Sequence, residues 1–195
     1  MRADPEPQFL RAADRVAAPW KNSRGWTREI AAFPPGADLD SFDWRVSMAT
    51  VDAGGPFSSF PGVDRMLAVL DGRLALTIDG RAPIELGPDT APLTFAGDVP
   101  VEADVLAGPA TDLNMMTRRG KVRGSLERLR IDAPAELAVS PTTIILTRTG
   151  GVGVIHRGRR HALSPDDAVM FEQSTTVRIE PGQKSSLFIV RVTRP

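Results

Sequence analysis

Residues 42–72, FDWRVSMATVDAGGPFSSFPGVDRMLAVLDG, hold the pattern that decides the fold of this chain. From residue 42 to residue 49, apolar side chains alternate with a second set that includes Arg45 and Ser47, which predicts a strand with one face in the core. A turn cluster at 52–56 and a loop at 57–62 precede a second strand, residues 64–70, that ends at an Asp-Gly turn. Two strands therefore bracket a loop shaped by Gly and Pro, and binding residues concentrate on loops that a rigid sheet supports.

The rest of the sequence continues this pattern of short strands. Alternating or apolar runs predict further strands at 26–32, 74–78, 101–106, 112–117, 126–131, 142–148, 152–156, 177–180 and 187–192, a short strand leading into a turn at 93–98, and a turn plus strand at 163–172. Turn signals recur at the spacing of about 8–12 residues that is typical of sandwiches and barrels, and no segment has a helical period. A basic turn at 118–121 predicts a boundary. We therefore expect an all-β double cupin, with a jelly-roll barrel and ligand pocket in residues 1–120 and a smaller barrel in residues 121–195.

The charge balance argues against a nucleic-acid partner. The chain has 24 basic and 24 acidic residues, so no net field draws it to nucleic acid or to an anionic membrane. Residues 1–120 contain 12 basic and 17 acidic side chains, and residues 121–195 contain 12 and 7, which gives net charges of −5 and +5. We interpret this difference as faces of opposite sign that meet within one molecule or across a homodimer.

Two absences in the sequence bound the chemistry and the location. The chain has no Cys, which excludes disulfides, thiolate metal sites and cysteine nucleophiles. The N-terminal residues lack the apolar run of a signal peptide, and no segment has the roughly 20 apolar residues of a membrane helix. We therefore expect a cytoplasmic protein with no membrane partner.

The histidines do not support a metal site. A cupin metal centre needs about three imidazole and carboxylate ligands that converge on the ion. Only His156 and His161 are present, and three arginines within 157–160 separate them and would repel a cation. The sequence therefore predicts a surface loop there, with no metal and no cofactor.

A series of motifs resembles the HutD/Ves family. The motifs are Trp20-Lys21-Asn22, Thr27-Arg28-Glu29-Ile30, the segment 42–47, the segments 55–58 and 60–65, Phe95 with Gly97-Asp98, and the segment 112–116. The resemblance spans about residues 9–120, and the remainder more loosely. It implies a bicupin fold without metal-binding histidines. It also implies a regulatory role in bacterial histidine utilisation through a pathway metabolite such as formylglutamate, with no established enzymatic activity. Family members often have a glycine run after the Asn, whereas Ser-Arg-Gly-Trp occupies residues 23–26 here.

Arginine is the side chain best matched to a small carboxylate, because its planar fork makes two parallel hydrogen bonds. If the polar faces of the strands line one barrel, they form a cavity with a cationic anchor, neutral donors and apolar walls. The predicted ligand-binding residues are Asn22, Thr27, Arg28, Glu29, Arg45, Ser47, Ser58, Phe60, Asp64, Arg65, Asn114 and Met116.

Structural roles compete with binding for the same residues. Arg65 could pair with Asp64 or Glu29, and Arg45 could lie on the surface or pair with Asp43 or Asp112. The aromatic residues of this region are more typical of core packing than of ligand stacking; they are Trp26, Trp44, Phe57 and Phe60.

Two other function classes remain open. A metal-independent isomerase or hydrolase acting on an acylated amino acid would use Glu29 or Asp64 as acid or base, although no catalytic residue has a local signature. An interaction module would dock a partner through its oppositely charged halves. In the second barrel we expect side chains rather than a pocket to fill the interior, namely Ile144, Val154, Met170, Phe171 and Ile189.

Overall fold

The computed structural model of the chain describes residues 6–20 and 25–195, and these residues confirm an all-β fold. Apart from one turn of 3-10 helix, η1 (Ala12–Asp14), the regular structure consists of strands. The chain divides into two compact units. The central unit is Arg15–Gly124 with the last two residues, and the split unit joins the residues up to Asp14 to Ser125–Thr193. No helix in the described part is long and apolar enough to cross a membrane.

The N-terminal strand belongs to the split unit, whereas the sequence placed it with residues 1–120. Strand β1 (Gln8–Leu10) pairs antiparallel with β15 (Ala168–Phe171), and Phe9 packs against the core of the split unit. A strand of three residues cannot bury an apolar side chain by itself, so its place depends on a partner that is distant in the sequence. The chain crosses between the units again at Gly124, close to the expected boundary at 120.

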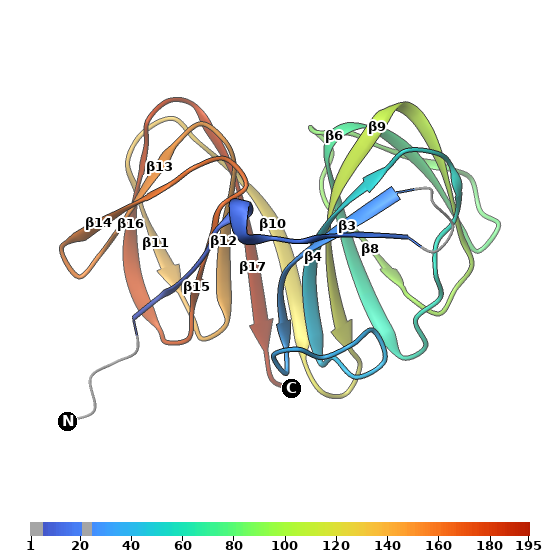
Figure 1. Cartoon of the computed structure of the whole chain (residues 1–195), viewed down its shortest axis with the longest axis horizontal. Helices are drawn as coiled ribbons and strands as arrows, with labels where there is room; N and C mark the ends of the chain where they lie inside the picture. Colours follow the sequence, from blue (N-terminus) through green and yellow to red (C-terminus); the bar gives the residue numbers. More distant parts are fainter. Residues whose placement is uncertain (1–5, 21–24) are drawn as a thin grey trace. The chain divides into compact units, whose positions relative to one another are not determined.

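The central unit is one eight-stranded sheet (Figure 1). Its order is β2 (Ala17–Pro19), β3 (Gly25–Phe33), β4 (Trp44–Val51), β9 (Val101–Arg118), β6 (Val63–Ile78) and β7 (Ile84–Leu86), with β5 (Gly55–Pro56) beside β9 and β8 (Leu93–Ala96) beside β6. Strand β4 is the alternating strand of the opening stretch, and its burial alternates in part as its sequence does. The two longest strands, β6 and β9, are paired along most of their lengths.

The Asp-Gly pair at residues 71–72 bends a strand instead of closing a hairpin. The runs predicted as separate strands at 64–70 and 74–78 form the single strand β6, whose register against β9 shifts between Val69 and Leu74. Gly72 has a φ of 71°, and a Cβ there would lie 2.5 Å from the carbonyl oxygen of Ala107. The shift is a bulge that bends the strand, which a tight turn signal in the sequence does not distinguish from a hairpin.

The bend allows one face of this sheet to curl around a core. A single apolar cluster contains residues from both halves of β6 together with residues of β4, β7, β8 and β9, among them Val51, Leu67, Leu76, Leu86 and Phe95. We call the face that encloses this cluster the concave face. Side chains that share this face with Leu67 and Val69 are directed toward the same interior.

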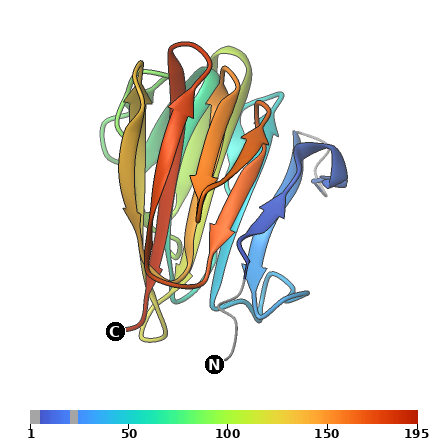
Figure 2. The same ribbon diagram turned by 90° about the vertical axis from the view of Figure 1, so that its left-hand side faces the viewer.

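The split unit has two antiparallel sheets. One has the order β1, β15, β12 (Thr143–Thr149), β17 (Ser185–Thr193) and β10 (Arg123–Ile131); the other has the order β11 (Ala135–Val139), β16 (Thr175–Pro181), β13 (Val152–His156) and β14 (Arg159–Leu163). Figure 2 faces this unit and shows its strands side by side. Its core includes Val154, Phe171 and Ile189, as predicted. Ile144 and Met170 pair with each other outside that cluster, because they alternate with Ile145 and Val169, which belong to it.

Candidate ligand site on the concave face

Strand register brings most of the predicted polar residues onto the concave face. Residues directly opposite one another on neighbouring strands share a face of the sheet. Across β4, β9 and β6 the successive rows are Arg45, Met116 and Arg65; then Ser47, Asn114 and Leu67; then Ala49, Asp112 and Val69. Leu67 and Val69, which end two of these rows, belong to the apolar core cluster of this unit. The polar side chains therefore lie at one end of the enclosed face, as the sequence predicted for β4 and β9.

Arg65 is the cation of this cluster. Arg65 is only 6% exposed. Its guanidinium carbon lies 5.0, 5.6 and 5.1 Å from the ring centres of Phe57, Phe60 and Phe95, respectively. Burial lowers its pKa to about 10, with the charge of Asp112 acting in the opposite direction, so the guanidinium remains protonated at neutral pH. Its Nε is buried and has no hydrogen-bond partner among the described residues.

Two buried oxygens lie on the same face. Asp112 and Asn114 are 1% and 7% exposed, and the Oδ1 atom of each has no hydrogen-bond partner among the described residues. Burial raises the pKa of Asp112 to about 7, while the charge of Arg65 lowers it by a smaller amount. Buried polar groups are nearly always paired, so three unpaired groups on one face indicate a place for a ligand or for ordered water.

The loop between β5 and β6 holds two aromatic rings over Arg65. The Phe60 amide donates to the Gly97 carbonyl and the Gly97 amide donates to the Val63 carbonyl, each at 2.7 Å. A Cβ at residue 97 would lie 2.9 Å from the Val63 oxygen, so this close approach requires glycine. The Gly-Asp motif at 97–98 therefore fixes the position of Phe60 against the guanidinium.

Arg45 belongs to a second polar group on the same face. Its Nε donates to Glu29 Oε2 at 2.8 Å and its Nη1 donates to Ser47 Oγ at 3.0 Å. Glu29 and Ser47 are themselves opposite each other on β3 and β4. Asp43, which was one expected partner of Arg45, instead accepts a hydrogen bond from Lys121 at 2.7 Å. Arg45 thus has structural partners that Arg65 lacks.

Two predicted residues lie on the opposite face of the sheet. Arg28 is exposed and alternates with Glu29, so it is directed away from the concave face. Asp64 alternates with Arg65, and its Oδ1 accepts a hydrogen bond from Arg119 at 2.7 Å. Arg119 also binds Asp98, and that contact holds the pKa of Asp98 well below its usual range. Arg28 and Asp64 therefore do not join the cluster, and Asp64 cannot share an acid and base role with Glu29.

Four further residues were predicted to bind the ligand, and three of them are described. Ser58 is exposed in the loop after β5. Thr27 accepts a hydrogen bond from Trp20 Nε1 at 2.7 Å on the concave side of β3. Met116 is buried in a small apolar cluster next to Arg65. The prediction for Asn22 lies outside the described residues.

Three residues of the cluster were not among the predicted ligand contacts. The sequence analysis predicts Asp112 only as a partner of Arg45, although strand alternation places it on the same face as Asn114 and Met116. The sequence predicts Phe57 as a core residue and identifies Phe95 only as part of a motif that resembles the family. No sequence signal places their rings against Arg65, because the contacts join separate strands and a loop.

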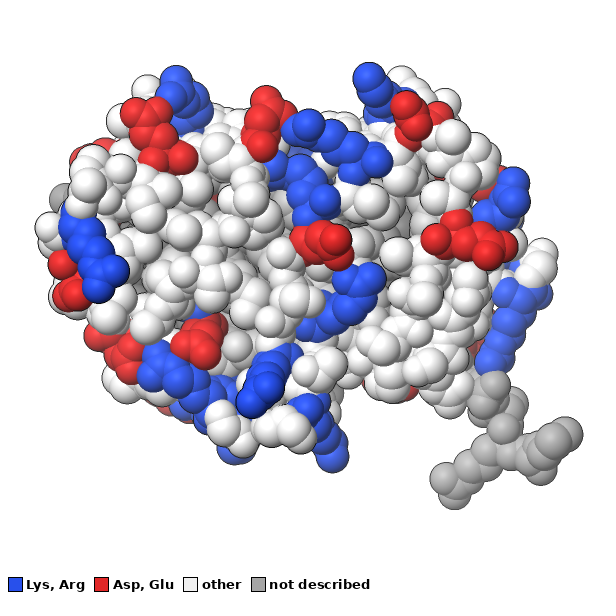
Figure 3. Space-filling view, turned by 180° about the vertical axis from the view of Figure 1, so that it is seen from behind, with Lys and Arg blue, Asp and Glu red and all other residues white. Residues whose placement is uncertain are grey.

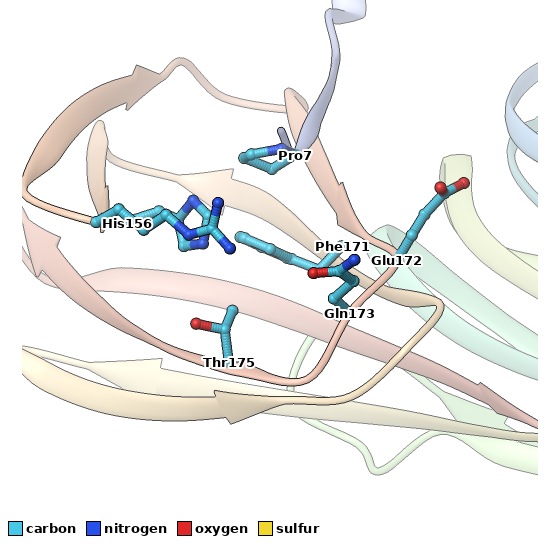
Figure 4. Close-up of a pocket in the computed structure, with 7 residues that line it drawn as sticks. Pro7, His156, Phe171, Glu172, Gln173 and Thr175 are labelled. Atoms are coloured by element: carbon cyan, nitrogen blue, oxygen red, sulfur yellow. The ribbon is translucent and has the colours of Figure 1, made fainter. Parts of the chain in front are cut away.

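The histidines are not on a surface loop as predicted. His156 is 4% exposed at the end of β13, and the His161 ring on β14 lies 4.6 Å from the ring of Phe9. Burial lowers the pKa of His156, and the nearby charge of Arg157 lowers it further. Figure 4 shows a pocket there, lined by Pro7, His156, Arg157, Phe171, Glu172, Gln173 and Thr175. Among residues 6–20 and 25–195, no three His, Cys, Asp or Glu side chains form a group that could hold a metal ion.

Several charged side chains of the second half pair with one another. Arg160 and Arg178 both approach Glu180, at 3.5 and 3.2 Å, and Arg191 approaches Glu127 at 3.1 Å. On the face shown in Figure 3, acidic and basic side chains are interspersed.

Fold and site together define a class of protein: an all-β chain with a cupin-like fold and a buried, polar, cationic cluster on a concave sheet. A cupin 2 conserved barrel domain protein from Leptotrichia buccalis is similar in fold alone, with 8% identity and a TM-score of 0.59 over 90% of this chain and 92% of that chain. The HutD family model matches residues 12–189. The chain therefore belongs to the HutD family.

Relatives and solved structures agree with this assignment. Protein Ves of Cronobacter sakazakii is 32% identical over 176 residues, which cover 87% of this chain and 90% of Ves. An uncharacterized 21.2 kDa protein in the hutC 3' region of Pseudomonas putida is 36% identical over 140 residues, or 71% of this chain and 72% of that protein. A conserved protein of unknown function from Pseudomonas aeruginosa PAO1 has 29% identity and a TM-score of 0.88, covering 96% of this chain and 99% of that chain. HutD from Pseudomonas fluorescens SBW25 has 27% identity and a TM-score of 0.81, covering 97% and 100%.

Proposed function

We propose that this chain binds a small carboxylate on the concave face of its central unit and thereby reports on histidine utilisation. The observation that carries the proposal is the buried guanidinium of Arg65, whose Nε has no partner among the described residues. An ionised carboxylate supplies the acceptor that Nε lacks and adds a negative charge beside the guanidinium. The aromatic rings around Arg65 supply apolar walls and weaken the competition from water.

The pathway in this proposal comes from relatives. One relative is a protein in the hutC 3' region, and a similar solved structure is HutD itself. A sensor of this kind needs to bind a metabolite reversibly without turnover. The proposal includes a bicupin arrangement of two barrels, a cytoplasmic location, and a small carboxylate rather than nucleic acid or a membrane as the partner.

A thermal-shift and calorimetry screen tests the proposal. The wild-type chain is titrated with small carboxylates that include formylglutamate, urocanate and glutarate. A ligand at 100 times its dissociation constant adds about 2.7 kcal/mol to the free energy of unfolding, which is a clear rise in melting temperature. We expect Arg65→Met, which keeps the length of the side chain and removes its charge, to abolish this rise.

The matched control is Arg73→Met, because Arg73 is an exposed arginine of the same unit that pairs with Glu85. Each variant is compared with its own ligand-free melting temperature, so a loss of stability by itself does not mimic a loss of binding. A rise that persists in Arg65→Met, or no rise with any carboxylate, would contradict the proposal.

An enzyme is the second candidate, and one observation favours it. Burial raises the pKa of Asp112 to about 7, which is the range in which a carboxyl group both gives and takes a proton at neutral pH. In this reading Asp112, rather than Glu29 or Asp64, acts as the acid or base on a ligand held by Arg65. Proton NMR of each binding carboxylate with wild type and Asp112→Asn distinguishes the two functions. Product signals that appear with the wild type and not with the variant would establish turnover by Asp112. A spectrum that does not change with the wild type would favour the sensor function.

A further inference from the structure

Polar side chains close one end of the interior of the split unit. On β13, His156 shares a face with Val154, which lies opposite His161 on β14. Val154 belongs to the apolar core of this unit, so both imidazole rings are directed to its interior. On β16, Thr175 shares a face with Val177, another residue of the same core. The apolar interior of the split unit therefore ends in polar groups that include both histidines.

The imidazole of His156 lacks a hydrogen-bond partner. His156 is 4% exposed, and its ring lies edge-on to the ring of Phe171, with 5.7 Å between the ring centres. The imidazole makes no hydrogen bond to any residue in the described part of the chain. Burial lowers its pKa, so the ring is neutral at pH 7 and offers one N–H donor. It lines the pocket of Figure 4, and a polar side chain that is buried to this extent normally has a partner.

The charge around this pocket is mainly positive. Arg157 lines the pocket, and Arg159 lies opposite His156 on the neighbouring strand, where Glu6 comes within 3.9 Å of it. After burial, the charge of Arg157 lowers the pKa of His156 by more than Glu6 raises it, which indicates a positive potential at the ring. Glu172 also lines the pocket, but Figure 4 shows its carboxylate directed away from His156. The pocket therefore suits an anion.

We propose that this pocket binds a small tetrahedral oxyanion, namely a phosphate group that is either free or part of a phosphate ester. Figure 4 shows Gln173 and Thr175 around the same hollow as His156. The oxygens of a phosphate group accept from the guanidinium of Arg157, the imidazole N–H, the amide of Gln173 and the hydroxyl of Thr175. A carboxylate, with two oxygens and a single charge, satisfies fewer of these donors. The site shares no residue with the concave face of the central unit, so it is independent of the function proposed above.

Proton NMR observes this site directly, because His156 and His161 are the two histidines of the chain. Their ring C–H signals are assigned with His156→Gln and His161→Gln. The full chain at pH 7 is titrated with inorganic phosphate, with phenyl phosphate, and with sodium chloride at equal ionic strength. We expect a saturable shift of the His156 signal with the phosphate probes and no such shift with chloride.

Sulfate is the probe for the dependence on pH, because it keeps its full charge in the range where an imidazole titrates. A bound dianion favours the protonated form of a neighbouring imidazole. We therefore expect saturating sulfate to raise the pKa of His156, and sulfate to bind roughly tenfold more tightly when that ring is protonated. A pKa of His156 that is the same with sulfate as with chloride would contradict the proposal.

Two variants remove donors from the pocket. We expect the affinity for phosphate to fall roughly tenfold or more in Arg157→Met and severalfold in Thr175→Val, because each loses a hydrogen bond to the anion. Arg178→Met is the matched control, since Arg178 is an exposed arginine of β16 that alternates with Val177 and approaches Glu180 at 3.2 Å. It should retain the affinity of the wild type.

Glu6→Gln tests the charge of the site in the opposite direction. It removes the carboxylate near Arg159 and should tighten phosphate binding, a gain that a folding defect does not produce. Saturation by both phosphate probes supports a site for the phosphate group; saturation by phenyl phosphate alone assigns it to esters, and saturation by inorganic phosphate alone assigns it to the free ion. Shifts that chloride reproduces at equal ionic strength would overturn the proposal, as would saturable binding that neither Arg157→Met nor Thr175→Val weakens.

Discussion

Burial gives Arg65 and Asp112 a role that exposed ion pairs of the same unit do not have. Arg119 makes hydrogen bonds of 2.7–2.8 Å to Asp64 and Asp98, yet its side chain is 39% exposed and water screens these contacts. Arg65 and Asp112 have fewer partners but are almost fully removed from water. The energy of the charged form of each side chain therefore depends strongly on a neighbouring charge or ligand. Arg65 and Asp112 therefore differ from the exposed charged residues of the unit in their burial, not in their residue type.

The carboxyl group of Asp112 makes stability depend on pH. Its pKa is about 7 in the folded chain against an ordinary value of 3.8. The folded state thus binds the proton more tightly, and the free energy of unfolding falls as the pH rises from about 4 to about 7. We expect Asp112→Asn to remove this contribution, which amounts to at most about 1.4 kcal/mol per pH unit. Urea unfolding of the ligand-free chain at half-unit steps between pH 4.5 and pH 8 measures it.

Asp52→Asn is the control for this experiment, because Asp52 is an exposed aspartate of the same unit. Its stability curve should run parallel to that of the wild type. A wild-type curve that also runs parallel to that of Asp112→Asn across the whole range would show that Asp112 titrates equally in the folded and unfolded chains.

The bend in β6 is the feature of the sheet that makes the site. Before the bend in sequence, β6 carries Arg65 and Leu67. After the bend it carries Leu74 and Leu76, which belong to the same apolar cluster as Leu67. Three register shifts between Val69 and Leu74 reverse the alternation, so that odd positions face the core before Gly72 and even positions face it afterwards. Without this change the second half of the strand would direct its leucines away from the core.

Gly72→Ala tests this element. A Cβ at residue 72 would lie 2.5 Å from the Ala107 oxygen and 2.8 Å from the Ala110 Cα, in addition to the strain of a positive φ. We expect a loss of roughly 3 kcal/mol or more of unfolding free energy, because backbone atoms of β9 have to move apart. Thermal and urea unfolding measure the loss.

Gly80→Ala is the matched control, since Gly80 has a φ of 66° and nothing within 4 Å of a Cβ. It should lose only about 1–2 kcal/mol through backbone strain. Equal losses at the two positions would show that the bulge at Gly72 tolerates a side chain and that close packing of β6 on β9 is not required there.

At the scale of the whole molecule, the chain leaves the split unit and later returns to it. Residues up to Asp14 and Ser125–Thr193 form one unit, and Arg15–Gly124 of the central unit is inserted between them. Asp167 ties the N-terminal segment down by accepting from the Ala12 amide and Arg11 Nη1, both at 2.8 Å, and from the Ser164 amide at 3.0 Å. The split unit is therefore closed by contacts between distant ends of the sequence.

Asp167→Ala should loosen this closure without affecting the ligand site. The variant leaves amide groups of the N-terminal segment and of the β14–β15 turn without their acceptor, at a cost of about 1–3 kcal/mol. Hydrogen exchange should show reduced protection in β1 and unchanged ligand-induced stabilisation of the central unit. Asp132→Ala, at an exposed position, should change neither. Undiminished protection of β1 in Asp167→Ala would contradict the role of this carboxylate.

The sequence by itself determined the class of structure and much of the site. Period-two alternation is a local property, so it predicted strands, and it placed Arg45 with Ser47 and Asn114 with Met116 on common faces. The motifs that resemble the HutD family could also be identified in the sequence, and the family model confirms that resemblance. Alternation also places Arg28 on the face opposite to that of Glu29, as the structure shows.

Only the tertiary structure decided what depends on contacts between distant residues. Whether the Asp-Gly pair at 71–72 turns or bulges depends on β9, and the partner of β1 lies about 160 residues away in the split unit. The burial of Asp112 and the three rings around Arg65 likewise come from curling of the sheet. Burial sets the pKa and the unpaired state of these groups, and burial is a property of packing rather than of local sequence.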